Sequence, residues 1–140
     1  MVDEKDLKIL EMLLANARTP FTDIAREVGI SDVAVAKRIK RLENLGIIKK
    51  YTILLNYSRL NYVASLTGID VEPEHLYTIT DELKKKGYIK YLALTTGDHS
   101  LIAFITARNS AEMSEIHKEL LATRGIKRVC PAIIIDMIKY

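Results

Sequence analysis

The sequence has a single cysteine, Cys130, among its 140 residues, and it has no long run of apolar residues. A lone cysteine excludes an internal disulfide and is typical of proteins in a reducing compartment. No stretch approaches the ~20 apolar residues that a transmembrane helix needs. The N-terminal segment is acidic and has a helical pattern, unlike a signal peptide. These absences predict a cytoplasmic protein with no membrane partner.

The sequence also lacks the short motifs that mark common enzymes and metal sites. It has no Walker phosphate loop, no dinucleotide-binding fingerprint and no zinc-protease motif. Its three histidines, His75, His99 and His117, have no metal-ligand spacing with one another or with Cys130. No nucleophile is arranged with a base, so a small-molecule-binding enzyme is the least favoured function. We therefore expect no enzymatic activity, no cofactor and no metal.

Charge of either sign is also not in large excess. There are 21 Lys and Arg residues against 18 Asp and Glu residues, and the net charge is +3. Affinity for nucleic acid would therefore have to come from a local cluster of cations. The apolar fraction of 49% suits a folded chain, and the length allows one or two small domains.

The most informative segment, residues 31–46, has the pattern of a basic amphipathic helix. It begins with two possible N-cap residues and ends at Gly46, which suits the position after a helix C-terminus. One stripe with i, i+4, i+7 spacing is apolar and is predicted to belong to the core; it consists of Val35, Ile39 and Leu42. The opposite side carries small and basic residues, so it can approach a polyanion closely.

The preceding residues predict a helix-turn-helix. A shorter helical pattern covers residues 20–28, and Gly29 separates it from the basic helix. In this motif the second helix enters the major groove of DNA. Residues 3–15 predict a third helix, whose core face we expect to consist of Leu7, Leu10 and Leu14. Residues 47–55 have a strand pattern, so we expect a winged variant of the domain.

The basic run over residues 37–41, taken alone, is typical of a solvated charged face. Its place on the second helix of a three-helix unit instead favours binding to double-stranded DNA. The predicted DNA-binding residues are Asp32, four residues expected at base edges (Ser31, Val33, Ala36 and Lys37) and four expected at phosphates (Arg38, Lys40, Arg41 and Lys50).

The second half of the chain alternates strand and helix patterns. We expect strands at 63–71, 89–96, 101–107 and 126–138, and helices at 74–86 and 110–124. Pro131 indicates that the last strand bends or lies at a sheet edge. The order β-α-β-β-α-β predicts a ferredoxin-like unit and an α+β fold class. We expect a winged helix-turn-helix domain over residues 1–55, a hinge over 56–62 and the ferredoxin-like domain over 63–140.

The strands of this half are apolar on both alternations, as in the run Ile133-Ile-Ile135. A sheet that is apolar on both sides should be buried on both sides, but the predicted helices cover only one. A second copy of the chain is the simplest cover for the other face. We therefore predict a homodimer with two-fold symmetry through this half.

Short motifs follow one another in a characteristic order along nearly the whole chain. In the first half they are Asp6-Leu-Lys-Ile-Leu10, Ala17-Arg-Thr-Pro20, Ile24-Ala25, Gly29-Ile-Ser31, Val35, Arg38-Ile39, Arg41-Leu-Glu43 and Gly46-Ile-Ile48. In the second half the motif is Thr95-Thr-Gly-Asp98. Together these motifs resemble the Lrp/AsnC, or feast/famine, family of bacterial and archaeal transcriptional regulators, and its archaeal members most.

The resemblance implies a regulator that is not an enzyme and whose second domain is RAM/ACT-like. It implies dimers that form through the C-terminal sheets and that assemble into tetramers or octamers. It also implies a small-molecule effector, commonly an amino acid, which binds between dimers near the Gly-Asp turn. An architectural protein that compacts DNA with little sequence choice is the alternative.

The effector residues that follow from the resemblance are Thr95, Thr96, Gly97, Asp98, His99 and Ser100. Backbone N–H groups around the glycine would hold a carboxylate, and Asp98 would pair with an ammonium group. Without the resemblance, these residues are typical of a plain hairpin turn. Many relatives have Gly-Asp-aromatic-Asp here, so His99 and Ser100 depart from the pattern, remove one carboxylate and leave the effector open.

Overall fold

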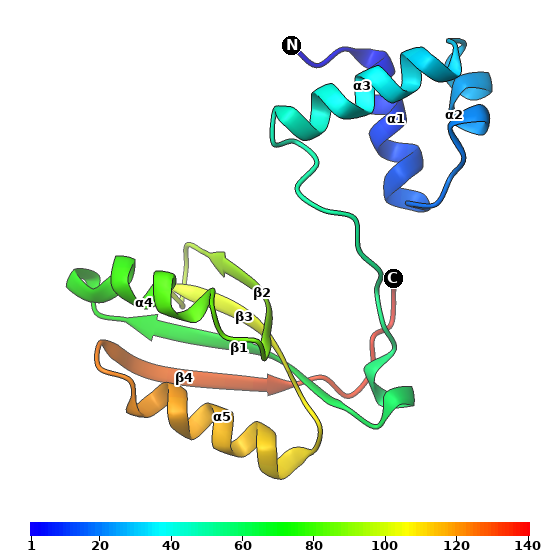
Figure 1. Cartoon of the computed structure of the whole chain (residues 1–140). Coiled ribbons are helices and arrows are strands. Elements are labelled where there is room, and N and C mark those ends of the chain that lie inside the picture. Colours follow the sequence, from blue (N-terminus) through cyan, green and yellow to red (C-terminus); the bar gives the residue numbers. More distant parts are fainter. The chain divides into compact units, whose positions relative to one another are not determined.

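The computed structural model describes residues 1–140, which form two units, Met1–Leu54 and Leu55–Tyr140 (Figure 1). The first unit contains α1 (Glu4–Ala15), α2 (Phe21–Val28) and α3 (Asp32–Asn44). The second contains the 3₁₀ turn η1 (Tyr57–Leu60), β1 (Val63–Val71), the 3₁₀ turn η2 (Pro73–His75), α4 (Leu76–Leu83), β2 (Ile89–Leu94), β3 (Leu101–Ala107), α5 (Ser110–Ala122) and β4 (Ile126–Ile133). None of these helices is long and apolar enough to cross a membrane.

The helix-turn-helix is confirmed by its caps and by its core. The Oγ atom of Ser31 accepts a hydrogen bond from the backbone N–H of Ala34 at 3.1 Å, so it caps α3. Gly29, with φ +76°, ends α2 in the left-handed conformation that glycine adopts without strain. The predicted stripe of α3 is buried, and the core of the unit consists of Ile9, Ile24, Ala25, Val35, Ile39 and Leu42.

The predicted core face of α1 is wrong. Leu7 and Leu14 are 53% and 86% exposed, whereas Ile9 is fully buried and Met12 and Leu13 pack against the core. This helix is apolar around most of its circumference, so periodicity alone does not select a face. Asp6 selects it, because its buried carboxylate pairs with α3 and turns the neighbouring stripe inward.

The predicted strand over residues 47–55 is also absent, so the unit has no wing. The segment carries exposed apolar residues, among them Ile53 at 72% and Leu54 at 64%. A strand needs a neighbour to satisfy its backbone N–H and C=O groups, and the unit Met1–Leu54 contains no other strand. The extended segment is held near α3 by Tyr51, whose hydroxyl donates to Oε1 of Glu43 at 2.8 Å.

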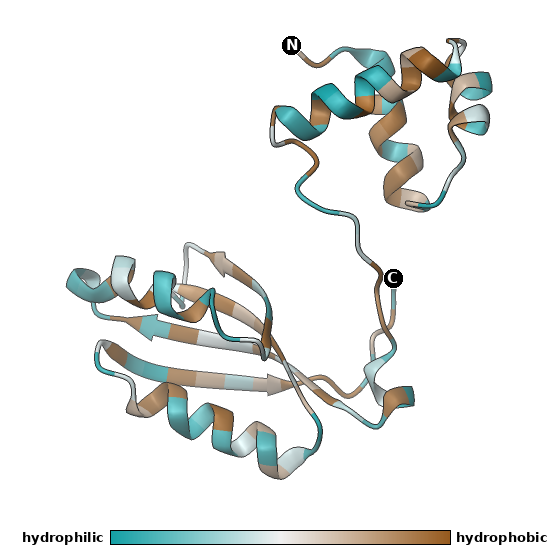
Figure 2. Cartoon of the chain, viewed as in Figure 1, coloured by the Kyte–Doolittle hydropathy of each residue, from teal (hydrophilic) through white to brown (hydrophobic).

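The second unit is a four-stranded antiparallel sheet with strand order β2-β3-β1-β4. Both helices pack on the same face, because Ile79 of α4 and Ile116 of α5 share one core cluster with Ile69 of β1 and Ile105 of β3. Apolar and hydrophilic residues alternate around α5, as the colouring in Figure 2 shows. The predicted βαββαβ order is therefore confirmed, and Pro131 lies on an edge strand as expected.

The other face of this sheet is largely apolar, and neither α4 nor α5 covers it, although Tyr57 of η1 packs against Phe104 of β3 at a centroid distance of 5.7 Å. In the register, Leu66 of β1 lies opposite Phe104 of β3, and Gly68 lies opposite Ile102. Leu66 is 47% exposed, and the ring of Tyr91 on β2 packs against Phe104 at a centroid distance of 6.0 Å. We refer to this surface as the open sheet face.

Candidate nucleic-acid interface and ligand cleft

Six of the predicted DNA-binding residues lie on the exposed side of α3 or at its start: Ser31, Asp32, Val33, Ala36, Lys37 and Lys40. Val33 is 65% exposed although it is apolar, so the helix offers an uncharged contact surface beside its cations. Lys37 makes no ion pair, and Lys40 makes only a long one of 3.8 Å with Glu43. Lys50 is exposed in the extended segment after the helix. This side of α3 can therefore meet both bases and phosphates.

The two remaining predicted phosphate contacts, Arg38 and Arg41, point to the N-terminus of α1 instead. Nη1 of Arg38 donates to Oδ1 of Asp6 at 2.9 Å and to Oδ2 of Asp3 at 2.8 Å. Nη2 of Arg41 donates to Oδ2 of Asp6, and its Nη1 donates to the carbonyl oxygen of Met1 at 2.8 Å. We refer to Asp3, Asp6, Arg38 and Arg41 as the charge cluster. The sequence does not predict this cluster, because no local pattern joins residues 32 to 35 positions apart.

The charge cluster changes the acidity of its buried member. Burial raises the pKa of Asp6, but hydrogen bonds from the Asp3 backbone N–H and from the two guanidinium groups outweigh that effect and lower it to about 2. Asp3, at the exposed end of the cluster, also has a lowered pKa, chiefly because of its hydrogen bond with Arg38. Both carboxylates are therefore ionised at neutral pH and hold the arginines.

The predicted effector turn, which joins β2 to β3, lines an open cleft of about 360 Å³ together with the end of β1 and the start of β4. Gly97 has φ +94°, and the turn is closed by a hydrogen bond from the Thr95 N–H to the Ser100 carbonyl at 3.0 Å. The cleft is lined by Asp70, Val71, Thr95, Thr96, Gly97, Asp98, His99, Ser100 and Lys127. The structure thus brings the predicted residues together and adds three from β1 and β4.

His99 folds back from the turn onto the open sheet face. Its ring lies over Gly68, and a Cβ atom placed there would come within 2.4 Å of the imidazole. Its Nδ1 is 2.9 Å from Oδ1 of Asp70, and the other oxygen of Asp70 accepts from Nε of Arg128 at 2.7 Å. Hydrogen bonds with His99 and Arg128 lower the pKa of Asp70. Asp70 and Arg128 are neighbours only through the β1–β4 register, which sequence patterns do not give.

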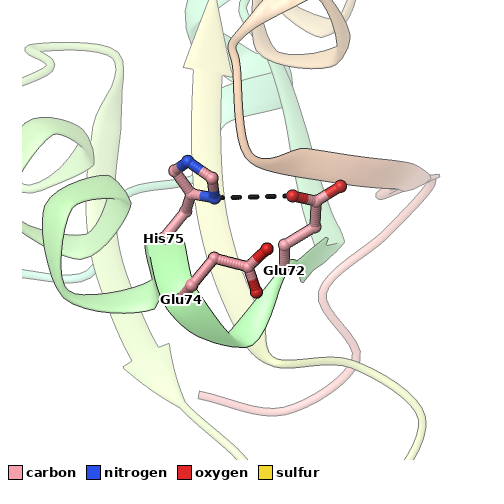
Figure 3. Close-up of side chains that lie close together, drawn as sticks. All are labelled: Glu72, Glu74 and His75. Carbon is pink, nitrogen blue, oxygen red and sulfur yellow. Dashed lines mark ion pairs between the residues drawn. The ribbon is translucent and has the colours of Figure 1, made fainter.

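The other two histidines do not line the cleft. Nε2 of His117 is 2.8 Å from the hydroxyl of Thr67 in the core, and burial lowers the pKa of His117. His75 lies beside Glu72 and Glu74, with one ligand atom of each within 4.8 Å of the others (Figure 3). Two carboxylates and an imidazole are donors that a divalent cation accepts, but Nδ1 of His75 already faces Oε2 of Glu72 at 3.4 Å.

Comparisons with known proteins agree over the whole chain. Residues 2–43 match the AsnC-type helix-turn-helix domain. The HTH-type transcriptional regulator LrpA of Pyrococcus horikoshii is 43% identical over 141 residues, which cover 99% of this chain and 100% of LrpA. The crystal structure of PH0061 has a TM-score of 0.91 at 22% identity and covers 100% of this chain and 97% of its own. A complex of the regulator NMB0573 of Neisseria meningitidis with L-Met has a TM-score of 0.82 at 20% identity, with coverage of 100% and 94%.

Proposed function

Because this chain belongs to the Lrp/AsnC family of DNA-binding transcriptional regulators, we propose that it binds specific DNA sequences and that a bound amino acid controls this binding. The observation that carries the DNA-binding part is the exposed side of α3, which presents Val33, Ala36 and Lys37. The helix is capped at its start, and its opposite side is buried in the core. A single cysteine and a DNA partner support a cytoplasmic location.

The residues of this surface divide by chemistry. Ser31, Val33, Ala36 and Lys37 face the bases, where small and apolar side chains allow close approach to the groove floor. Lys40 and Lys50 hold phosphates. A two-fold dimer reads a pseudo-palindromic site whose half-sites are about 34 Å apart, or a multiple of that distance.

Selection of binding sites from random duplexes, with and without a pool of amino acids, tests this proposal directly. Lys40→Ala should weaken binding to all sequences. The salt slope, which is the slope of the logarithm of the binding constant against the logarithm of the salt concentration, should become shallower by about 0.9, the loss expected for one phosphate contact. Lys37→Ala should instead change the preferred sequence. Lys118→Ala removes an equally exposed lysine from α5 and should change neither property.

Two results would contradict the proposal. Intact operator binding after substitution of every residue assigned to bases and phosphates would remove α3 as the contact surface. If the ratio of the affinity for selected duplexes to the affinity for random duplexes is near one, an architectural, DNA-compacting protein is favoured instead.

The cleft around the Gly97 turn supports amino-acid binding through opposite charges. Asp98 is exposed and makes no ion pair, so it is available to the ammonium group of a ligand. Lys127 on β4 is also exposed and unpaired, and together with the turn's N–H groups it suits the carboxylate. The L-Met complex of the fold neighbour from Neisseria supports the same ligand class.

Titration calorimetry with each of the common amino acids tests the cleft. One or a few should bind, and Asp98→Asn and Lys127→Met should each weaken that binding at least tenfold, because each removes one half of the zwitterion's contacts. Lys90→Met, which removes a lysine on β2 outside the cleft lining, is the control. No heat from any amino acid would end the effector proposal and would leave the DNA-binding part standing.

We also propose that two copies pair through the open sheet face and that dimers assemble further into tetramers or octamers. The support is chemical: the face carries Leu66, Ile102 and Phe104, and neither α4 nor α5 covers it. Apolar area of this kind on a sheet is most often buried by another layer.

A further inference from the structure

The charge cluster ties the start of α1 to the middle of α3. Arg38 and Arg41 lie one turn apart on α3, and both reach the carboxylate of Asp6. Arg38 takes one oxygen of Asp6 and Arg41 takes the other, so the carboxylate is held from two points along the helix. Two such contacts, together with the buried stripe of Val35, Ile39 and Leu42, resist rotation of α3 about its own axis.

Both carboxylate oxygens of Asp6 accept hydrogen bonds in this arrangement. Its side chain is fully buried, and its Oδ2 also accepts from the backbone N–H of Asp3 at 3.0 Å. In return, the backbone N–H of Asp6 donates to Oδ1 of Asp3 at 2.9 Å, which completes a capping box at the start of α1. The position of the carboxylate is therefore set by the helix end itself, and the arginines follow it.

The cluster also sets which cations face away from α1. Lys37 and Lys40 each precede one of the arginines by one residue, so they lie about 100° around the helix from them. The lysines are exposed, whereas the side chain of Arg38 is only 26% exposed. Release of the arginines would add two flexible cations to the flank of the surface that we assign to DNA.

We propose that Asp6 is a positioning residue for DNA recognition, which fixes the rotation of α3 through Arg38 and Arg41 and keeps their charges away from the phosphates. This inference rests on the DNA-binding function proposed above. It reassigns the two arginines, which the sequence predicts as phosphate contacts, to an internal role. Specificity then depends on a residue of α1 that touches no DNA.

Asp6→Asn in the full chain tests the proposal, since it keeps the shape of the side chain and removes its charge. Arg41 loses its carboxylate partner and should bind a phosphate, whereas Arg38 keeps its contact with Asp3, so affinity for random duplexes should rise and its salt slope should steepen by about 0.9. The preference for the selected operator should fall about tenfold, because α3 loses its fixed rotation. Circular dichroism should show retained helix content.

Asp81→Asn is a matched control in the other unit. Asp81 of α4 holds two lysines just after the end of that helix, Lys84 at 2.9 Å and Lys85 at 3.3 Å, so its substitution makes the same charge change and frees two cations. It should alter neither the salt slope nor the operator preference. If D6N and D81N have equal effects, the change in net charge alone explains the result, and the proposal is overturned.

Arg41→Gln gives an answer that does not depend on the folding of D6N. If Arg41 is internal, its loss should leave the salt slope of wild-type binding unchanged; a slope that becomes shallower by about 0.9 would place Arg41 on a phosphate and refute the proposal. A wild-type protein that binds no duplex at low salt would refute the DNA-binding function itself, which is a different outcome.

Discussion

Asp6 shows how one residue connects folding to pH in this protein. Its pKa is about 2 in the folded chain against an ordinary value of 3.8, so the unfolded chain binds more protons between these values. The cluster therefore contributes about 2 kcal/mol of stability above pH 4, and this contribution is lost as the pH falls through the folded pKa. Asp6→Asn should destabilise the protein by that amount at neutral pH.

Urea unfolding at several pH values measures this contribution. The difference in unfolding free energy between wild type and D6N should shrink toward zero as the pH approaches about 2, because a protonated Asp6 resembles asparagine. A difference that stays constant across this range would show that shape or packing, and not charge, makes Asp6 stabilising.

His117 should make the second unit sensitive to mildly acidic pH. Burial lowers its pKa from the ordinary value of 6.5, so the unfolded chain takes up the proton first. The stability of the unit is therefore complete above about pH 6.5 and is lost as the pH falls through the folded pKa. His117→Gln keeps a polar group for Thr67 and removes the titration.

Thermal unfolding near neutral pH and near pH 5 distinguishes the two proteins. The Tm of wild type should fall more than the Tm of H117Q over this interval. Only in wild type does unfolding expose an imidazole that then takes up a proton, which stabilises the unfolded chain. Parallel decreases in both proteins would contradict the assignment.

At the scale of elements, the sequence predicts best those segments whose pattern is compatible with only one element and one buried face. The bounds predicted for β1 and β3 match the structure, and the buried stripe of α3 is Val35, Ile39 and Leu42 as expected. A single apolar stripe leaves a helix one way to face the core, and the two strands are short apolar runs bounded by polar and turn residues. The helix predicted over 74–86 is shorter, because Pro73 begins a 3₁₀ turn and α4 ends at Leu83.

The failures have a common physical cause, which is dependence on distant partners. The face of α1 depends on arginines from another helix, and a strand over residues 47–55 would need a neighbour that its own unit does not offer. The same holds for the site. The sequence predicts the turn at Gly97, but Asp70 and Lys127 join its cleft only through sheet register. The N-cap of α5 is Asn109, and the neighbouring Ser110 is an equally suitable capping residue, so the sequence alone does not fix where this helix begins.

Gly68 links the open sheet face to the turn, and Gly68→Ala tests that link. The added Cβ would overlap the His99 ring at 2.4 Å, so the ring should leave Asp70 and displace the turn, at a cost of about 1–3 kcal/mol. Amino-acid binding in the cleft should weaken as well. Gly87→Ala, where an added Cβ meets nothing within 4 Å, should leave both unchanged. An unshifted His99 side-chain resonance in G68A would contradict this prediction.

At the scale of the whole molecule, the central question is how copies of the chain pair. If the open sheet face is the dimer interface, wild type should sediment as a dimer or larger at micromolar concentration. Leu66→Asp should shift it to monomers, since a carboxylate would be buried without a partner. Leu121→Asp alters a leucine on α5 that is 55% exposed, against 47% for Leu66, and should leave the assembly intact.

A monomeric wild-type protein under these conditions would contradict the pairing, and an L66D protein that remains dimeric would move the interface elsewhere. A monomeric protein would cover a single half-site, so its affinity for palindromic duplexes would fall toward that for half-sites.

The edge position of β4 has a consequence for the behaviour of the protein at high concentration. This outer strand carries Pro131, which has no N–H to offer an incoming strand, and two exposed cations, Lys127 and Arg128. Such residues discourage the growth of a sheet by edge-to-edge addition, which is the route to fibres. We therefore expect concentrated solutions of this protein to remain free of cross-β aggregates as long as the fold persists.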